Sequence, residues 1–71
     1  MTFALCLNNA DYEVSLELRK LYPVLPPEPN DPQGYVRIID ESGEDYLYSA
    51  EAFEIIQLAP HIEQRLVATL G

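Results

Sequence analysis

The chain has 71 residues, 48% of them hydrophobic, which is enough for one domain with a thin core and too little for two. Its 12 acidic and 4 basic residues give a formal net charge of −8. A field of this sign repels nucleic-acid phosphates and anionic membranes, and it favours a basic protein partner.

Two extended segments are predicted near the N-terminus. Residues 3–7 are apolar and end at the turn-forming pair Asn8-Asn9, which indicates a first strand. Residues 12–18 alternate between apolar and polar side chains, which favours an extended, half-buried segment. The apolar side chains of that segment are expected on one face: Val14, Leu16 and Leu18.

A further strand and a rigid loop follow. Residues 21–25 favour a strand, in which Pro23 indicates an edge position or an irregular strand because proline has no amide donor. Residues 26–34 are rich in proline and end at Gly34, which predicts a loop of restricted conformation.

The clearest pattern is a β-hairpin. Residues 34–40 and 45–49 are rich in strand-forming side chains and flank a turn at Gly43, so we expect two antiparallel strands. Inward-pointing side chains are expected to be Val36, Ile38 and Leu47. Strand alternation then places Tyr46 and Tyr48 on the outer face.

A single turn, a strand and a helix complete the chain. Residues 49–53 suit one 3₁₀ turn, residues 54–58 a short strand, and Pro60 a first helical position. An apolar stripe marks the predicted helix: Ile62, Leu66 and Leu70. We expect this stripe to close an open end of the strand assembly; packing on a partner or a second copy is the alternative.

Five short strands within the first 58 residues predict closure into a barrel, because an open sheet leaves exposed edges and one bare face. The predicted fold class is mainly β. It comprises a five-stranded barrel over residues 1–58, with a short 3₁₀ turn, and a C-terminal α-helix over 59–71 packed on it.

The order of these elements is similar to that of the SH3 fold. A closer resemblance is to a group of short bacterial proteins of unknown activity. These share a Tyr-Glu-x-Ser-Leu-Glu-Leu segment and an Arg-x-Ile-Asp-Glu-Ser-Gly-Glu-Asp-Tyr-Leu-Tyr block, which here span residues 12–18 and 37–48. The resemblance implies an SH3-like barrel and no particular chemistry. Two positions depart from it: Arg19 replaces a turn glycine, and Ser49 replaces a proline.

An SH3 likeness suggests binding of proline-rich peptides, which needs an aromatic groove that usually contains tryptophan. The chain has no tryptophan. A poorer aromatic surface is available from four residues: Tyr12, Tyr35, Tyr48 and Phe53.

The candidate site is a protein-interaction surface of tyrosines and the acidic hairpin. Its residues are Tyr35, Tyr46, Tyr48, Asp40, Glu41, Glu44 and Asp45. Tyrosine is common at interaction hot spots, although it is also an ordinary strand residue. The carboxylates could dock a lysine or arginine or form a weak Ca²⁺ loop, or they could be a solvated turn. Arg37 is expected to pair with one of them across the hairpin.

Catalytic and metal sites find little support in the sequence. Cys6 and His61 are the sole cysteine and histidine, and nothing in the chain places them together. We therefore expect no catalytic residue, no cofactor and no metal. A lone cysteine, the lack of a basic signal segment and the lack of an apolar run of roughly 20 residues indicate a cytoplasmic protein.

The function hypothesis is a monomeric, non-catalytic interaction or regulatory module of the bacterial cytoplasm. A nucleic-acid-associated barrel is the alternative. It would need a basic stripe, and the four basic residues are too scattered to form one: Arg19, Lys20, Arg37 and Arg65. A small enzyme is the third class considered.

Overall fold

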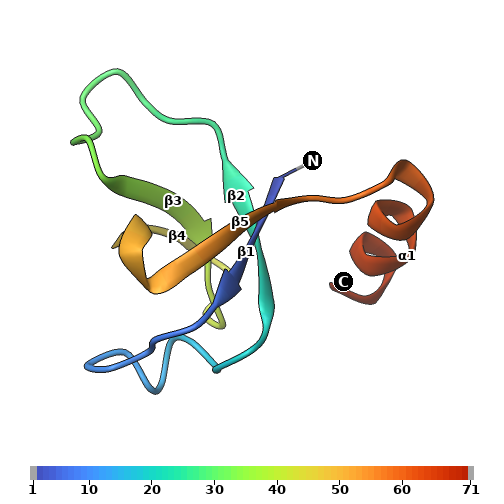
Figure 1. Ribbon diagram of the computed structural model, residues 1–71, viewed down its shortest axis with the longest axis horizontal. Coiled ribbons are helices and arrows are strands. Elements are labelled where there is room, and N and C mark those ends of the chain that lie inside the picture. The colour runs from blue at the N-terminus through green and yellow to red at the C-terminus, as the bar shows by residue number, and fades with distance from the viewer. Residues whose placement is uncertain (1, 71) are drawn as a thin grey trace.

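The computed structural model describes residues 2–70, with the exception of the Leu70 side chain, and consists of one antiparallel sheet followed by one helix (Figure 1). The strands are β1 (Thr2–Cys6), β2 (Leu21–Leu25), β3 (Tyr35–Ile39), β4 (Asp45–Ser49) and β5 (Phe53–Gln57). A 3₁₀ turn, Ala50–Ala52, joins β4 to β5, and helix α1 spans Pro60–Leu70. The predicted strands, hairpin, 3₁₀ turn and helix are all present, with small shifts in their bounds.

The sheet is open, so the predicted closure into a barrel is wrong. Its five strands run in the order β4-β3-β2-β1-β5, and β4 and β5 form the two edges. No described strand pairing joins the two edges, and side chains from outside the sheet complete the hydrophobic core. Leu16, from the irregular segment between β1 and β2, is 1% exposed and packs against the buried residues of the strands.

Eight side chains form the buried hydrophobic core among the described residues: Phe3, Ala4, Cys6, Leu16, Tyr22, Ile38, Tyr48 and Phe53. Phe3 and Ala4 are neighbours in β1 and are both fully buried. Successive residues of a strand point to opposite faces, so both sides of β1 are covered.

Residues 12–18 do not form the predicted extended segment. They fold into turns in which the amides of Ser15 and Leu16 donate to the carbonyl oxygen of Tyr12. The Asn9 side chain also donates to the Leu16 carbonyl oxygen, at 2.9 Å, and anchors this segment. Val14 is consequently 94% exposed, so the alternating pattern did not mark a single buried face.

Pro23 lies in a central strand, which corrects the expectation of an edge. It is paired with Phe3 of β1, but the ladder between β2 and β3 contains only Val24 and Leu25. Proline is tolerated here because pairing to β3 begins after it, where no amide is missing.

The β3–β4 hairpin is present, but the face predicted for β4 is inverted. The register places Val36 opposite Tyr48 and Arg37 opposite Leu47. Because opposite residues share a face, Tyr48 points into the core with Val36 and is 6% exposed. Leu47 shares the other face with Arg37, so its predicted inward direction is wrong.

Helix α1 stands beside the sheet instead of covering it (Figure 1). None of its described side chains is buried, and Ile62 is 46% exposed. Leu66 and Thr69 do line a groove of about 670 Å³ with residues of β2. Ile62 and Leu66 of the predicted apolar stripe are therefore not buried against the strands, and the side chain of Leu70, its third member, lies outside the described part of the chain.

Candidate functional site

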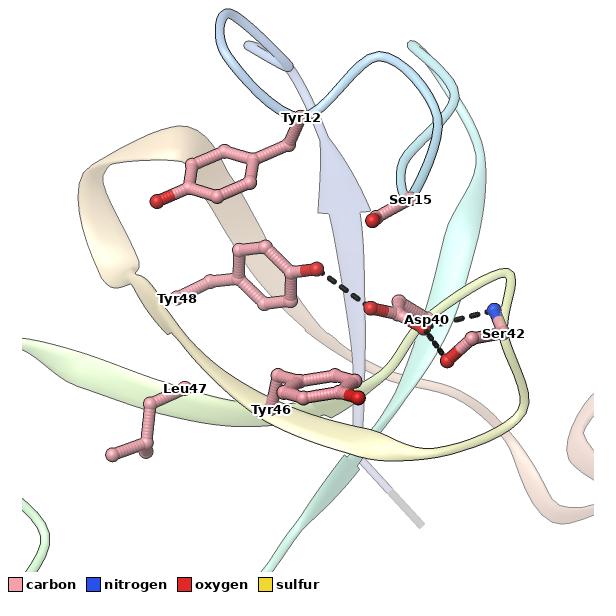
Figure 2. Close-up of a pocket in the computed structure, with 7 residues that line it drawn as sticks. All are labelled: Tyr12, Ser15, Asp40, Ser42, Tyr46, Leu47 and Tyr48. Atoms are coloured by element: carbon pink, nitrogen blue, oxygen red, sulfur yellow. Dashed lines mark hydrogen bonds between the residues drawn. The ribbon is translucent and has the colours of Figure 1, made fainter.

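Two adjoining hollows lie along β4 and form the candidate site, which we call the tyrosine groove. The first has a volume of about 320 Å³ and is lined by Tyr12, Ser15, Asp40, Ser42, Tyr46, Leu47 and Tyr48 (Figure 2). The second, of about 480 Å³, includes Asp11, Tyr35, Ser49 and Glu51. Both share Tyr12, Leu47 and Tyr48, so the groove is continuous past β4.

Aromatic rings form one wall of the first hollow. Figure 2 shows the rings of Tyr12, Tyr48 and Tyr46 following one another, with Leu47 directed away from them. Tyr12 and Tyr48 meet edge to face, with ring centroids 5.1 Å apart and an interplanar angle of 84°. Tyr48 also packs on the buried ring of Phe53, with centroids 6.1 Å apart, so it joins the half-exposed Tyr12 ring to the core.

Asp40 lies at the base of this hollow and is only 6% exposed, so the expectation that it belongs to a solvated turn is wrong. Its carboxylate accepts hydrogen bonds from the Tyr48 hydroxyl at 2.6 Å, the Ser42 hydroxyl at 2.5 Å and the Ser42 amide at 2.9 Å. Burial alone would raise the pKa of Asp40, but these donors outweigh it and the pKa is lowered.

The same contact acts on the Tyr48 phenol. Burial, together with the hydrogen bond to Asp40, raises the pKa of Tyr48 to about 12. At neutral pH the pair is therefore a charged carboxylate and a neutral donor, and it places a fixed negative charge beneath the tyrosine rings.

The other predicted site residues are divided between the groove and its surroundings. Tyr35 lines the second hollow and is half-exposed, and Tyr46 lines the first. Glu44 accepts a hydrogen bond from the Tyr46 hydroxyl at 3.1 Å, beside the groove. Tyr48, in contrast, is a core residue that presents only part of its ring, so the predicted outer patch of Tyr46 and Tyr48 does not exist in that form.

Glu41 is not part of the groove. Its carboxylate accepts hydrogen bonds from Lys20 at 2.6 Å and from the Tyr22 hydroxyl at 2.5 Å. These donors lower the pKa of Glu41, and its negative charge is paired within the protein.

The carboxylate of Asp45 is also paired within the protein. The predicted pairing of Arg37 with a hairpin acid is confirmed by its contact of 2.9 Å with Asp45. Arg37 also binds Asp31, in the proline-rich loop, at 2.6 Å, which the sequence had not indicated. The guanidinium of Arg37, on the strand next to β4, is therefore paired with acidic side chains of the protein itself.

Sequence reasoning missed two acidic residues of the second hollow, Asp11 and Glu51. Asp11 has a positive φ of 71°, in a turn that the asparagine pair before it had indicated. Glu51 lies in the 3₁₀ turn. No local pattern relates the two residues, because only the folded chain brings these two turns to the same hollow.

The groove is negatively charged. Asp11, Asp40 and Glu51 are among its lining residues, and none of the lining residues that the structure describes is lysine or arginine. Two of the four basic residues, Lys20 and Arg37, are held by acidic side chains elsewhere. The groove is therefore suited to a cationic ligand and unsuited to a phosphate.

Cys6 and His61 lie in different settings. Cys6 is buried in β1, where burial raises the pKa of its thiol, and His61 is exposed on α1. Within residues 2–70, no three histidine, cysteine, aspartate or glutamate side chains cluster closely enough to hold a metal ion. In the same part of the chain, no helix has the length and apolar character needed to cross a membrane.

Comparisons of the chain with protein-family models, with curated proteins and with solved structures found no match.

Proposed function

We propose that this protein is a non-catalytic interaction module that binds a basic segment of a partner protein in the tyrosine groove. One observation carries the proposal. A continuous hollow along β4 combines half-exposed tyrosine rings with carboxylates, and its described lining includes no basic side chain.

The chemistry of the groove matches a lysine or arginine side chain. Tyr12 and Tyr46 offer ring surface that a cation can contact through its π-electrons. Asp40 supplies a fixed negative charge, which its hydrogen bonds keep ionised. Tyrosine loses little conformational entropy on binding, so rigid rings of this kind are frequent binding hot spots.

The net charge of −8 acts at longer range. It attracts a basic partner before contact and makes the encounter faster at low ionic strength. The same field opposes nucleic acid, so we do not favour a nucleic-acid-binding function.

We also propose that the open sheet is an SH3-like arrangement, and that the chain is related to the short bacterial proteins that share its hairpin block. Support comes from the long irregular segment between β1 and β2 and from the 3₁₀ turn before β5. A cytoplasmic location is part of this proposal, since the free thiol of Cys6 suits a reducing compartment.

A calorimetric titration with a synthetic peptide tests the proposed function. The probe is a capped peptide of about ten alternating arginine and threonine residues, and the control peptide replaces arginine with glutamate. We expect the basic peptide alone to bind, with an affinity that falls as salt is added. Absence of binding at about 1 mM basic peptide contradicts the proposal.

Charge variants of the groove locate the binding. The double variant Asp11→Asn, Glu51→Gln removes two lining charges, and we expect it to weaken binding of the basic peptide severalfold. The double variant Glu13→Gln, Glu54→Gln is the matched control, because it also removes two charges and both residues are exposed and line neither hollow. An equal loss in the control would assign the effect to net charge alone.

A further inference from the structure

Three of the five residues of β4 direct their backbone groups away from the sheet. The amide of Ala50 donates to the carbonyl of Gly34 at 2.9 Å, and the amide of Asp40 donates to the carbonyl of Glu44 at 3.2 Å. Hydrogen-bonded pairs alternate in an antiparallel ladder, so Tyr46 and Tyr48 direct their backbone groups toward β3. The intervening residues direct theirs away from the sheet: Asp45, Leu47 and Ser49.

These free groups lie on an open edge. β4 is the last strand of the sheet order, and no backbone hydrogen bond outside the described strands and helices reaches Leu47 or Ser49. Ser49 is also the N-cap of the 3₁₀ turn, where its carbonyl begins the turn, so its amide is the group left for a partner. Leu47 and Ser49 line the second hollow, which Asp11 and Tyr12 of the β1–β2 segment also line. The unpaired edge therefore opens into the tyrosine groove.

Little in β4 discourages the addition of another strand. Edge strands are commonly protected by proline, lysine or a bulge, and Asp45–Ser49 contains neither proline nor lysine. The carboxylate of Asp45 is paired with Arg37 at 2.9 Å, which holds it on the side of the hairpin. The register between β3 and β4 is continuous over all five residues of each strand, without a bulge.

We propose that the partner of this protein binds as an extended basic segment that pairs with the free edge of β4 as an additional strand. This inference rests on the proposed function and specifies how the groove is occupied. Backbone groups of the segment bond to the amide and carbonyl of Leu47 and to the amide of Ser49, which supplies affinity that does not depend on side chains. Alternate side chains then point toward the tyrosine rings, where Asp40 and the cation–π contacts favour lysine or arginine.

Ser49 allows the backbone edge to be tested separately from the one groove side chain that the substitution changes. Its φ of −61° and ψ of 128° are already those of proline, and its side chain is exposed. Ser49→Pro removes one free amide donor, whereas Ser49→Ala keeps it and removes only the hydroxyl. We expect Ser49→Pro to bind the arginine–threonine peptide about tenfold more weakly than Ser49→Ala, because the two variants differ in the free amide and both lack the hydroxyl. Equal affinities of the two variants contradict strand addition.

Amide hydrogen exchange gives a second measurement that needs no variant. In the free protein, the amides of Leu47 and Ser49 should exchange faster than those of Tyr46 and Tyr48, which are bonded within the sheet. Saturating peptide should slow exchange at Leu47 and Ser49 and leave the other two unchanged. Binding without this protection overturns the inference and leaves the proposed function standing, whereas failure of the peptide to bind overturns the proposed function itself.

Discussion

The hydroxyl of Tyr48 donates a 2.6 Å hydrogen bond to the carboxylate of Asp40, and both residues are buried. This bond joins β4 to the start of the hairpin turn. It also fixes the negative charge at the base of the tyrosine groove. If a buried carboxylate loses such a donor, the free-energy cost of its desolvation remains without the compensating hydrogen bond. The stability of the fold and the charge of the groove therefore depend on the same contact.

Removal of this donor is expected to destabilise the protein. Tyr48→Phe should lower the free energy of unfolding by about 1.5–3 kcal/mol, the usual contribution of a hydrogen bond to a charged group. Urea denaturation measures the change. Tyr46→Phe is the control, because its hydroxyl bonds to Glu44 at the surface, and we expect its midpoint to be unchanged. Similar losses in both variants would deny the buried bond a special role.

Acid should destabilise the protein through Asp40. Its pKa is lowered in the folded state, so its contribution to stability is complete above the ordinary pKa near 3.8 and is lost as pH falls through the lowered value. The urea midpoint of the wild type should therefore fall between about pH 5 and pH 2. Asp40→Asn should show a shallower fall. Parallel curves would mean that Asp40 is not the responsible group.

The backbone at Arg19 predicts a stabilising substitution. Arg19 has a positive φ of 60°, which is unfavourable for a residue with a β-carbon. Arg19→Gly should raise the free energy of unfolding by about 1 kcal/mol, whereas Arg19→Ala should give no gain. A loss of stability on Arg19→Gly would indicate that the arginine side chain has a role.

Helix α1 should be dispensable for folding. None of its described side chains is buried, so removing the chain from residue 60 onward takes little from the core. We expect the shortened protein to keep the far-ultraviolet circular dichroism signal of its β-strands and to unfold in one cooperative transition. It should also bind the arginine–threonine peptide as the full chain does, since α1 does not line the groove. Unfolding on truncation would restore the predicted role of α1 as a cap.

The strands were predictable because each carries a local signal. Residues 21–25 were predicted as a strand, and β2 has those bounds. The error on β4 shows what local patterns omit. Alternation separates Leu47 from its neighbours but does not say which face is buried. The register depends on the turn, which closes with Asp40 bonded to Glu44 and thereby places Tyr48 beside the buried side chains.

The groove was only partly predictable for a related reason. Tyr35 and Tyr46 could be selected by residue type and strand pattern. The closure prediction was wrong: β4 and β5 remain the two edges of the sheet, and Leu16, from a segment without regular structure, joins the core. That segment also carries Asp11 and Tyr12 to the groove, and tertiary contacts alone determine where it lies.

Amide NMR spectra recorded during titration with the arginine–threonine peptide test the central claim most directly. If the tyrosine groove binds basic segments, signals of Asp11, Tyr12, Leu47 and Glu51 should move together and saturate, while those of α1 remain in place. Spectra that stay unchanged at about 1 mM peptide, or change only at α1, would contradict the account.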